Sequence, residues 1–117
     1  MTTRPVGRPP KYDGEPTKRK QIVVDVGIKN DMKAKAKAAG QSLTDYLLQS
    51  MENVISGAYD PVTRRASLRP ATNVGIEISV PLSLLANIED QMKLYGLTFT
   101  DFLLGAWTRR LEAEETA

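Results

Sequence analysis

Hydrophobic and polar residues follow two different periods along this chain, and the same succession of periods occurs twice. Two short segments rich in β-branched residues, 21–25 and 74–80, have the composition of strands, and the second alternates apolar with polar or small residues. Each is followed by two stretches in which apolar residues recur at helical spacing. The pattern therefore predicts strand, helix, helix, and then the same three elements again.

The residues at the expected helix ends agree with this division. Gly40 and Gly96 stand where a helix closes with a left-handed residue. Ser42 and Thr98 are favoured N-caps of the following helices, and each has an aspartate three residues later, as in a capping box. Pro81 ends the second strand and suits the first turn of the helix after it.

An internal repeat underlies the double pattern. A shift of 56 residues places 40–48 on 96–104, so that the glycine, a threonine-aspartate pair and two leucines coincide. The same shift, without a gap, aligns Ile22 with Ile78 in the expected strands. We interpret the chain as a duplication of one unit.

The repeat divides the chain into five segments. We expect a basic disordered arm at 1–17, a first repeat at 18–56, a basic linker at 57–73, a second repeat at 74–112 and a tail at 113–117. A unit of about 40 residues cannot close a core alone, so the repeats pair either within one chain as a pseudo-dimer or between chains as a homo-oligomer. We favour the first, because the linker reaches roughly 55 Å when extended. Leu47 and Leu103 are then buried where the repeats meet.

The composition excludes several classes of function. The chain has no cysteine and no histidine, which removes disulfides, thiolate nucleophiles and the commonest general base and metal ligand. It has no nucleotide-binding loop, so we expect no enzyme activity, no catalytic residue, no metal and no cofactor. No segment has the pattern of a signal peptide or a membrane span, which leads us to expect a soluble cytoplasmic protein without a membrane partner.

The charge is small in total but unevenly distributed. Residues 1–20 contain six basic and two acidic side chains, and residues 57–73 contain three basic and one acidic. Residues 74–117 contain three basic and seven acidic side chains. A basic arm and a basic linker indicate a polyanionic partner. The residues expected to supply these contacts are Arg4, Arg8, Lys11, Lys18, Lys20, Arg64 and Arg65. Residues 7–9, Gly-Arg-Pro, are similar to the core of an AT-hook for the DNA minor groove, and a purely electrostatic arm is the alternative.

The order strand, helix, helix resembles the ribbon-helix-helix family of the Arc and MetJ repressors. Gly40 lies fifteen positions after Asp25, and Gly96 lies fifteen positions after Pro81, a spacing similar to that family's. Two copies in one chain are similar to the TraY-type accessory proteins of plasmid transfer. The resemblance implies a mostly α fold with a short β-ribbon, made of two ribbon-helix-helix (β-α-α) repeats in tandem. It also implies sequence-specific binding of double-stranded DNA, as a transcriptional repressor or a plasmid partition or transfer accessory protein.

In that family the two-stranded ribbon enters the major groove, and alternate strand residues face the base edges. If the isoleucines and Val24 face the core, the base-reading side chains are Arg19, Gln21, Val23, Glu77 and Ser79, with Gly75 on the same face. The alternative is that Arg19 and Gln21 are ordinary solvated strand residues. Glu77 either accepts a hydrogen bond from cytosine or indicates that the second strand does not bind DNA.

The resemblance also assigns phosphate contacts to the start of each second helix, where free amides and the positive end of the dipole are exposed. These residues are Ser42, Leu43, Thr44, Thr98, Phe99 and Thr100. Helix capping alone is the other explanation for them. A different function stays open as well, in which the chain is an antitoxin-like or assembly module whose acidic second repeat binds a protein partner.

Overall fold

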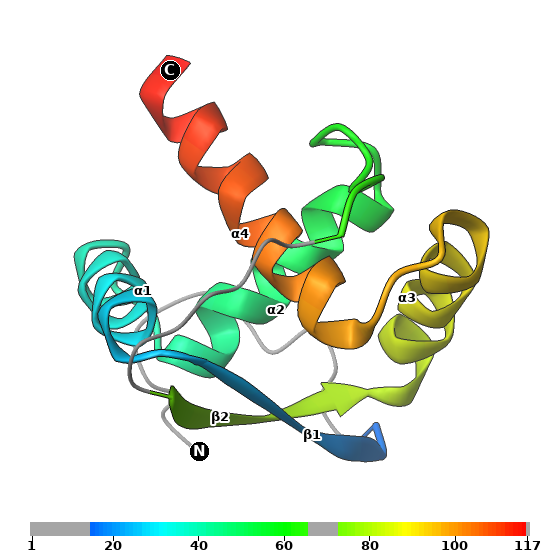
Figure 1. The fold of residues 1–117 in the computed structure, drawn as a ribbon, viewed down its shortest axis with the longest axis horizontal. Helices are drawn as coiled ribbons and strands as arrows, with labels where there is room; N and C mark the ends of the chain where they lie inside the picture. Colours follow the sequence, from blue (N-terminus) through cyan, green and yellow to red (C-terminus); the bar gives the residue numbers. More distant parts are fainter. Residues whose placement is uncertain (1–14, 66–72, 117) are drawn as a thin grey trace, which may run out of the picture.

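The described part of the structure, a computed structural model, comprises residues 15–65 and 73–116. It forms four helices and one two-stranded antiparallel sheet, so the protein is mostly helical (Figure 1). The elements are β1 (Thr17–Asp25), α1 (Val26–Ala38), α2 (Leu43–Ile55), β2 (Asn73–Pro81), α3 (Leu82–Tyr95) and α4 (Phe99–Thr116). Their order agrees with the order that the hydrophobic pattern predicts.

The two strands pair with each other within the single chain. The register runs from Thr17 opposite Pro81 to Asp25 opposite Asn73, which places Gln21 opposite Glu77. The core-facing side chains are Ile22, Val24, Ile76, Ile78 and Val80, all of them buried. The helices stand on this face of the ribbon, and none of residues 15–65 and 73–116 covers the other face (Figure 1).

The centre of the core is the crossing of α2 and α4, with α1 and α3 on either side (Figure 1). Leu47 and Leu103, at equivalent positions of α2 and α4, are both fully buried, as predicted. Tyr46 and Phe102 beside them are also fully buried. Because every helix contributes buried apolar side chains to the same cluster, the core joins both halves of the chain.

A buried arginine joins α2 to α4 beside these leucines. Arg110 is 8% exposed, and its guanidinium lies 4.0 Å from the centroid of the Tyr46 ring. It donates hydrogen bonds to the Tyr46 carbonyl (3.1 Å), to Ser50 Oγ (3.3 Å) and to Gln41 Oε1 (3.1 Å). Burial raises the pKa of the Tyr46 phenol, which accepts a hydrogen bond from Trp107 Nε1 at 3.2 Å. The hydrophobic pattern did not predict this polar cluster.

The helix ends form largely as the sequence predicts. Ser42 Oγ accepts from the Asp45 amide at 3.1 Å. At α4 the capping box is reciprocal, because Thr98 Oγ1 accepts from the Asp101 amide (3.1 Å) and Asp101 Oδ2 accepts from the Thr98 amide (2.9 Å). Gly40 and Gly96 have φ angles of 72° and 66°, the left-handed region that glycine tolerates best.

The start of α3 differs from the start of α1. Asp25 caps α1 with its own side chain, which accepts from the Gly27 amide, but Pro81 takes the corresponding place in α3 and has no side chain that can cap. Glu15, which lies 68 residues before Ser83, supplies the missing cap. The Ser83 amide donates to Glu15 Oε2 (2.7 Å) and Ser83 Oγ donates to Glu15 Oε1 (3.0 Å). The expected start of the folded region at residue 18 is therefore too late, and at least Glu15 belongs to the fold.

This long-range cap makes part of the stability depend on pH. The hydrogen bonds from Ser83, the backbone one first, lower the pKa of Glu15. A carboxylate with a lowered pKa contributes stability that is fully present above its unfolded pKa and is lost as the pH falls through the folded pKa. We expect Glu15→Gln to remove this contribution, so that the melting temperature of the variant falls less steeply with acidification than that of the wild type. Glu89→Gln, an exposed change on α3, is the control, and an unchanged pH profile in Glu15→Gln would contradict the assignment.

Two other boundaries differ from the expected ones. The first part of the linker packs on the core, because Val62 is buried against Gly105 of α4, where a Cβ atom would collide with it. The expected tail at 113–117 is instead helical as far as Thr116. No glycine or proline interrupts α4 after Gly105, and Arg110 pairs with Glu114 one turn later at 3.4 Å.

Candidate nucleic-acid interface

The outer face of the ribbon carries the side chains expected to face away from the core. All of them are exposed: Arg19, Gln21 and Val23 on β1, and Gly75, Glu77 and Ser79 on β2. The register sets Arg19 opposite Ser79, Gln21 opposite Glu77 and Val23 opposite Gly75. Because side chains alternate along a strand, burial of the isoleucines on the inner face directs these six residues to the outer face.

The two charged residues of this face form an ion pair. Arg19 Nε lies 3.4 Å from Glu77 Oε1, and the side chains are 71% and 53% exposed. An exposed pair of this kind is worth at most about 1 kcal/mol. Either partner can therefore exchange it for a stronger hydrogen bond to a ligand at little cost.

The other end of the ribbon is less polar. Val23 is 50% exposed, as its place on the outer face of the ribbon requires. Its partner Gly75 presents only backbone, and Lys29 of α1 donates to the Gly75 carbonyl at 3.0 Å. Lys29 could not be predicted to reach the strands, because helical spacing alone does not show which lysine of α1 lies beside them.

The helices α2 and α4 begin beside the ribbon, where α2 contacts β2 and α4 contacts β1 (Figure 1). Of the residues expected to bind phosphate, Ser42 and Thr98 are exposed, and Thr44 and Thr100 are half-buried. Leu43 and Phe99 point their side chains into or against the core. These two residues can offer a phosphate only their backbone amides.

Two cations lie at the start of α4. Lys20 Nζ is 5.4 Å from the centroid of the Phe99 ring, and Arg65 Nε is 3.6 Å from the buried Asp101 carboxylate. The Arg65 side chain is mostly exposed, so its guanidinium remains accessible. Lys18 is exposed on the same side of β1 as Lys20. Alternation places both lysines on the inner face of the ribbon, opposite Val80 and Ile78. The expected basic residues Lys20 and Arg65 are thus placed beside a helix start and not on the outer face.

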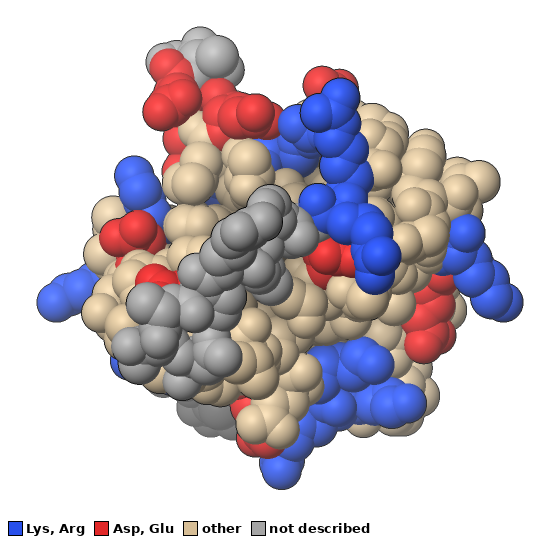
Figure 2. Space-filling model, viewed as in Figure 1, with Lys and Arg blue, Asp and Glu red and all other residues tan. Residues whose placement is uncertain are grey.

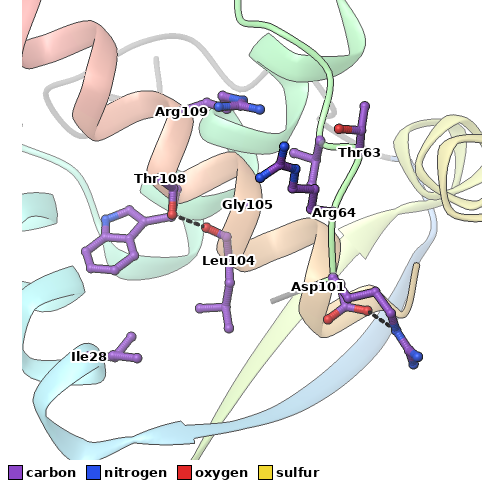
Figure 3. A pocket seen from close by; sticks show the side chains of 11 residues that line it. Ile28, Thr63, Arg64, Asp101, Leu104, Gly105, Thr108 and Arg109 are labelled. Carbon is purple, nitrogen blue, oxygen red and sulfur yellow. Dashed lines mark hydrogen bonds and ion pairs between the residues drawn. The ribbon is translucent and has the colours of Figure 1, made fainter. Parts of the chain in front are cut away.

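Arg64 and Arg65 both line a cavity of about 350 Å³ between residues 62–65, α4 and the first turn of α1 (Figure 3). Apolar side chains, including those of Ile28, Leu104 and Trp107, line part of this cavity, and Arg109 approaches it from α4. Figure 2 shows one group of basic side chains at the linker and α4 and another near the ribbon. Both described linker arginines therefore border the same cavity, where Arg65 pairs with Asp101.

The described residues offer little for other chemistry. Among residues 15–65 and 73–116, no three side chains of Asp or Glu gather as metal ligands would. None of the helices in these ranges is both long and apolar enough to cross a membrane. The expected arm contacts Arg4, Arg8 and Lys11, and the AT-hook-like motif with them, lie outside the described residues.

Comparison with known proteins does not add to this picture. No protein-family model matches the chain, and neither a curated protein nor a solved structure was found to match it.

Proposed function

We propose that this chain binds double-stranded DNA by inserting the β1–β2 ribbon into the major groove. The observation that carries the proposal is the outer face of the ribbon, which the described residues leave uncovered and which presents hydrogen-bonding side chains in a row. The major groove is about 12 Å wide and admits a two-stranded β-ribbon. Arg19, Gln21, Val23, Glu77 and Ser79 then read the base edges.

We further infer that the fold is a pair of β-α-α units in tandem, similar to the ribbon-helix-helix family. The order of the six elements supports this inference. The register supports it independently, because Gln21 and Glu77 are separated by the repeat length of 56 residues and lie opposite each other. An antiparallel pair of equivalent strands has its two-fold axis at such a position.

Phosphate contacts would hold the ribbon in the groove. The helices α2 and α4 begin beside the ribbon, so their N-terminal amides can bind phosphates on either side of the groove. Lys20 and Arg65 add positive charge at the start of α4. Such contacts position the protein without reading sequence.

On these grounds we propose a transcriptional repressor or a plasmid partition or transfer accessory protein that acts in the cytoplasm and is not an enzyme. In this proposal both repeats contact the DNA, since β2 forms half of the ribbon. Glu77 therefore lies at the centre of the proposed contact, where it can accept a hydrogen bond from a cytosine amino group.

Titration of duplex DNA with the wild type, Arg19→Ala and Gln21→Ala tests the proposal. We expect each substitution to reduce the preference for a selected sequence over random DNA by about 1–3 kcal/mol, because base contacts discriminate and phosphate contacts do not. Lys37→Ala, which removes an exposed charge from the last turn of α1, is the matched control and should leave the preference unchanged.

The salt dependence of the same titration tests the phosphate contacts. The logarithm of the affinity should fall with the logarithm of the salt concentration by about 0.9 per phosphate contacted. A flat response would contradict the phosphate contacts. Equal losses on both DNAs for Arg19→Ala and Gln21→Ala would contradict the proposed reading face.

A further inference from the structure

The outer face of the ribbon departs from the two-fold symmetry of its backbone. The register centres the two-fold axis on the pair Gln21 and Glu77. Rotation about this axis exchanges residues 56 apart, so Arg19 takes the place of Gly75 and Val23 takes the place of Ser79. None of these three pairs consists of identical residues, and the two ends of the face differ in chemistry.

One end of the face is a hydrogen-bonding end, formed by Arg19 and Ser79. The Arg19 guanidinium is exposed, and within the described ranges it pairs with Glu77 through Nε, so its other N–H groups can form a bidentate contact with the O6 and N7 atoms of guanine. The opposite end is an apolar end, formed by Val23 and Gly75. The Val23 methyl groups suit the C5-methyl group of thymine, and Gly75 brings no side chain between the backbone and the DNA.

The two ends of the outer face also differ in the cations that lie beside them. Lys20 and Arg65 lie at the start of α4, next to the hydrogen-bonding end. At the start of α2 the position equivalent to Lys20 is Ile76, which is buried. The cation at the apolar end, Lys29, donates to the Gly75 carbonyl. Lys20 and Arg65 thus bring positive charge to the helix start beside the hydrogen-bonding end, whereas the equivalent place at the start of α2 holds the apolar Ile76.

We propose that one chain recognises a DNA sequence that is not a palindrome, and that it binds this sequence in a single orientation. Guanine lies at the hydrogen-bonding end, thymine at the apolar end, and the central pair Gln21 and Glu77 contacts adenine and cytosine. This inference rests on the proposed DNA-binding function and adds the class of DNA site and the residues that orient it.

Selection from a pool of duplexes tests the inference. The full chain is used, and the random window spans about one helical turn, roughly 10 base pairs, so that one chain binds each duplex. We expect the enriched sequence to lack two-fold symmetry. Arg19→Ala should lower the preference for guanine by about 5- to 150-fold and leave the thymine end unchanged. Val23→Ser should act on the thymine end alone.

A variant with a symmetric face provides the matched comparison. Val23→Ser, Gly75→Arg and Glu77→Gln together place Arg and Ser at both ends and Gln at both central positions. A side chain at residue 75 would approach the end of Gln21, at 3.2 Å from Nε2, and this flexible group can move aside. We expect this triple variant to select a palindrome with guanine at both ends, at an unchanged melting temperature.

Each outcome separates the inference from the function on which it rests. A palindrome selected by the wild type would overturn the inference and leave DNA binding in place. A triple variant that folds and still selects an asymmetric sequence would overturn it too, because the orientation would then come from outside the ribbon. If the triple variant does not fold, Arg19→Ala and Val23→Ser still test the inference, because each should change the base preference at only one end of the selected sequence. If the wild type enriches no sequence, the proposed function itself fails, and the inference fails with it.

Discussion

Leu47→Ala and Leu103→Ala are each expected to destabilise the whole protein by about 2–5 kcal/mol. Both leucines are fully buried at the crossing of α2 and α4, where removal of three carbon atoms leaves a cavity that neighbouring side chains fill only in part. Such a loss is a large share of the stability of a domain of this size. Because the strands pair within the chain and all helices share one core, either variant should unfold in one transition.

Chemical denaturation followed by two probes measures this effect. Circular dichroism reports the helices, and the fluorescence of Trp107, the single tryptophan of the chain, reports the crossing of α2 and α4. The two transitions should coincide and should not depend on protein concentration. Leu94→Ala is the control, since Leu94 is 68% exposed and its loss should change stability by less than about 0.5 kcal/mol. Two separate transitions would show that the halves fold independently.

Arg110→Ala is expected to cost roughly 2–4 kcal/mol. The substitution removes the hydrogen bonds that Arg110 donates to the Tyr46 carbonyl, Ser50 and Gln41, although Ser50 Oγ still donates to that carbonyl at 2.9 Å. It also removes the aliphatic stem and the guanidinium that cover the Tyr46 ring. Arg110→Met restores most of the packing without the hydrogen bonds, so it should be less destabilising than Arg110→Ala. The difference between the two variants separates the loss of packing from the loss of donors.

The neighbouring arginine is a control of matched chemistry. Arg109 pairs with Glu112 at 3.0 Å on the surface of α4 and donates to the Pro61 carbonyl at 3.2 Å. Arg109→Ala should therefore cost no more than about 1 kcal/mol. Similar melting curves for Arg109→Ala and Arg110→Ala would show that the buried cluster does not contribute as we infer.

Local signals were sufficient to predict most of the fold. Strand alternation placed Arg19 and Glu77 on the outer face, and the caps at Ser42 and Thr98 were readable from residues three positions apart. These features depend on neighbours within one turn or one strand, which a single sequence displays. For the same reason the outward-facing set of the candidate site could be predicted.

Features that depend on residues far apart in the chain were missed. Arg110 stands in a charged stretch that also contains Arg109 and Glu112, so nothing in the periodicity distinguishes the buried arginine from its solvated neighbours. Val62 is buried because Gly105, on a later helix, leaves space for it. Glu15 caps a helix that begins 67 residues later, at Leu82, because Pro81 cannot. The cations beside α4 belong to the same class, since they come from β1 and the linker.

The pairing of β1 and β2 within one polypeptide also affects how the protein responds to dilution. A ribbon assembled from two separate chains exists only above the concentration at which those chains associate. On dilution, the concentration of assembled ribbon therefore falls more steeply than the total concentration of chains. Here the covalent connection keeps the two strands at a high effective concentration whatever the number of copies. If the chain binds DNA as proposed, its occupancy of a site should vary in simple proportion to its abundance when the chain is scarce, without the threshold that an obligate dimer imposes.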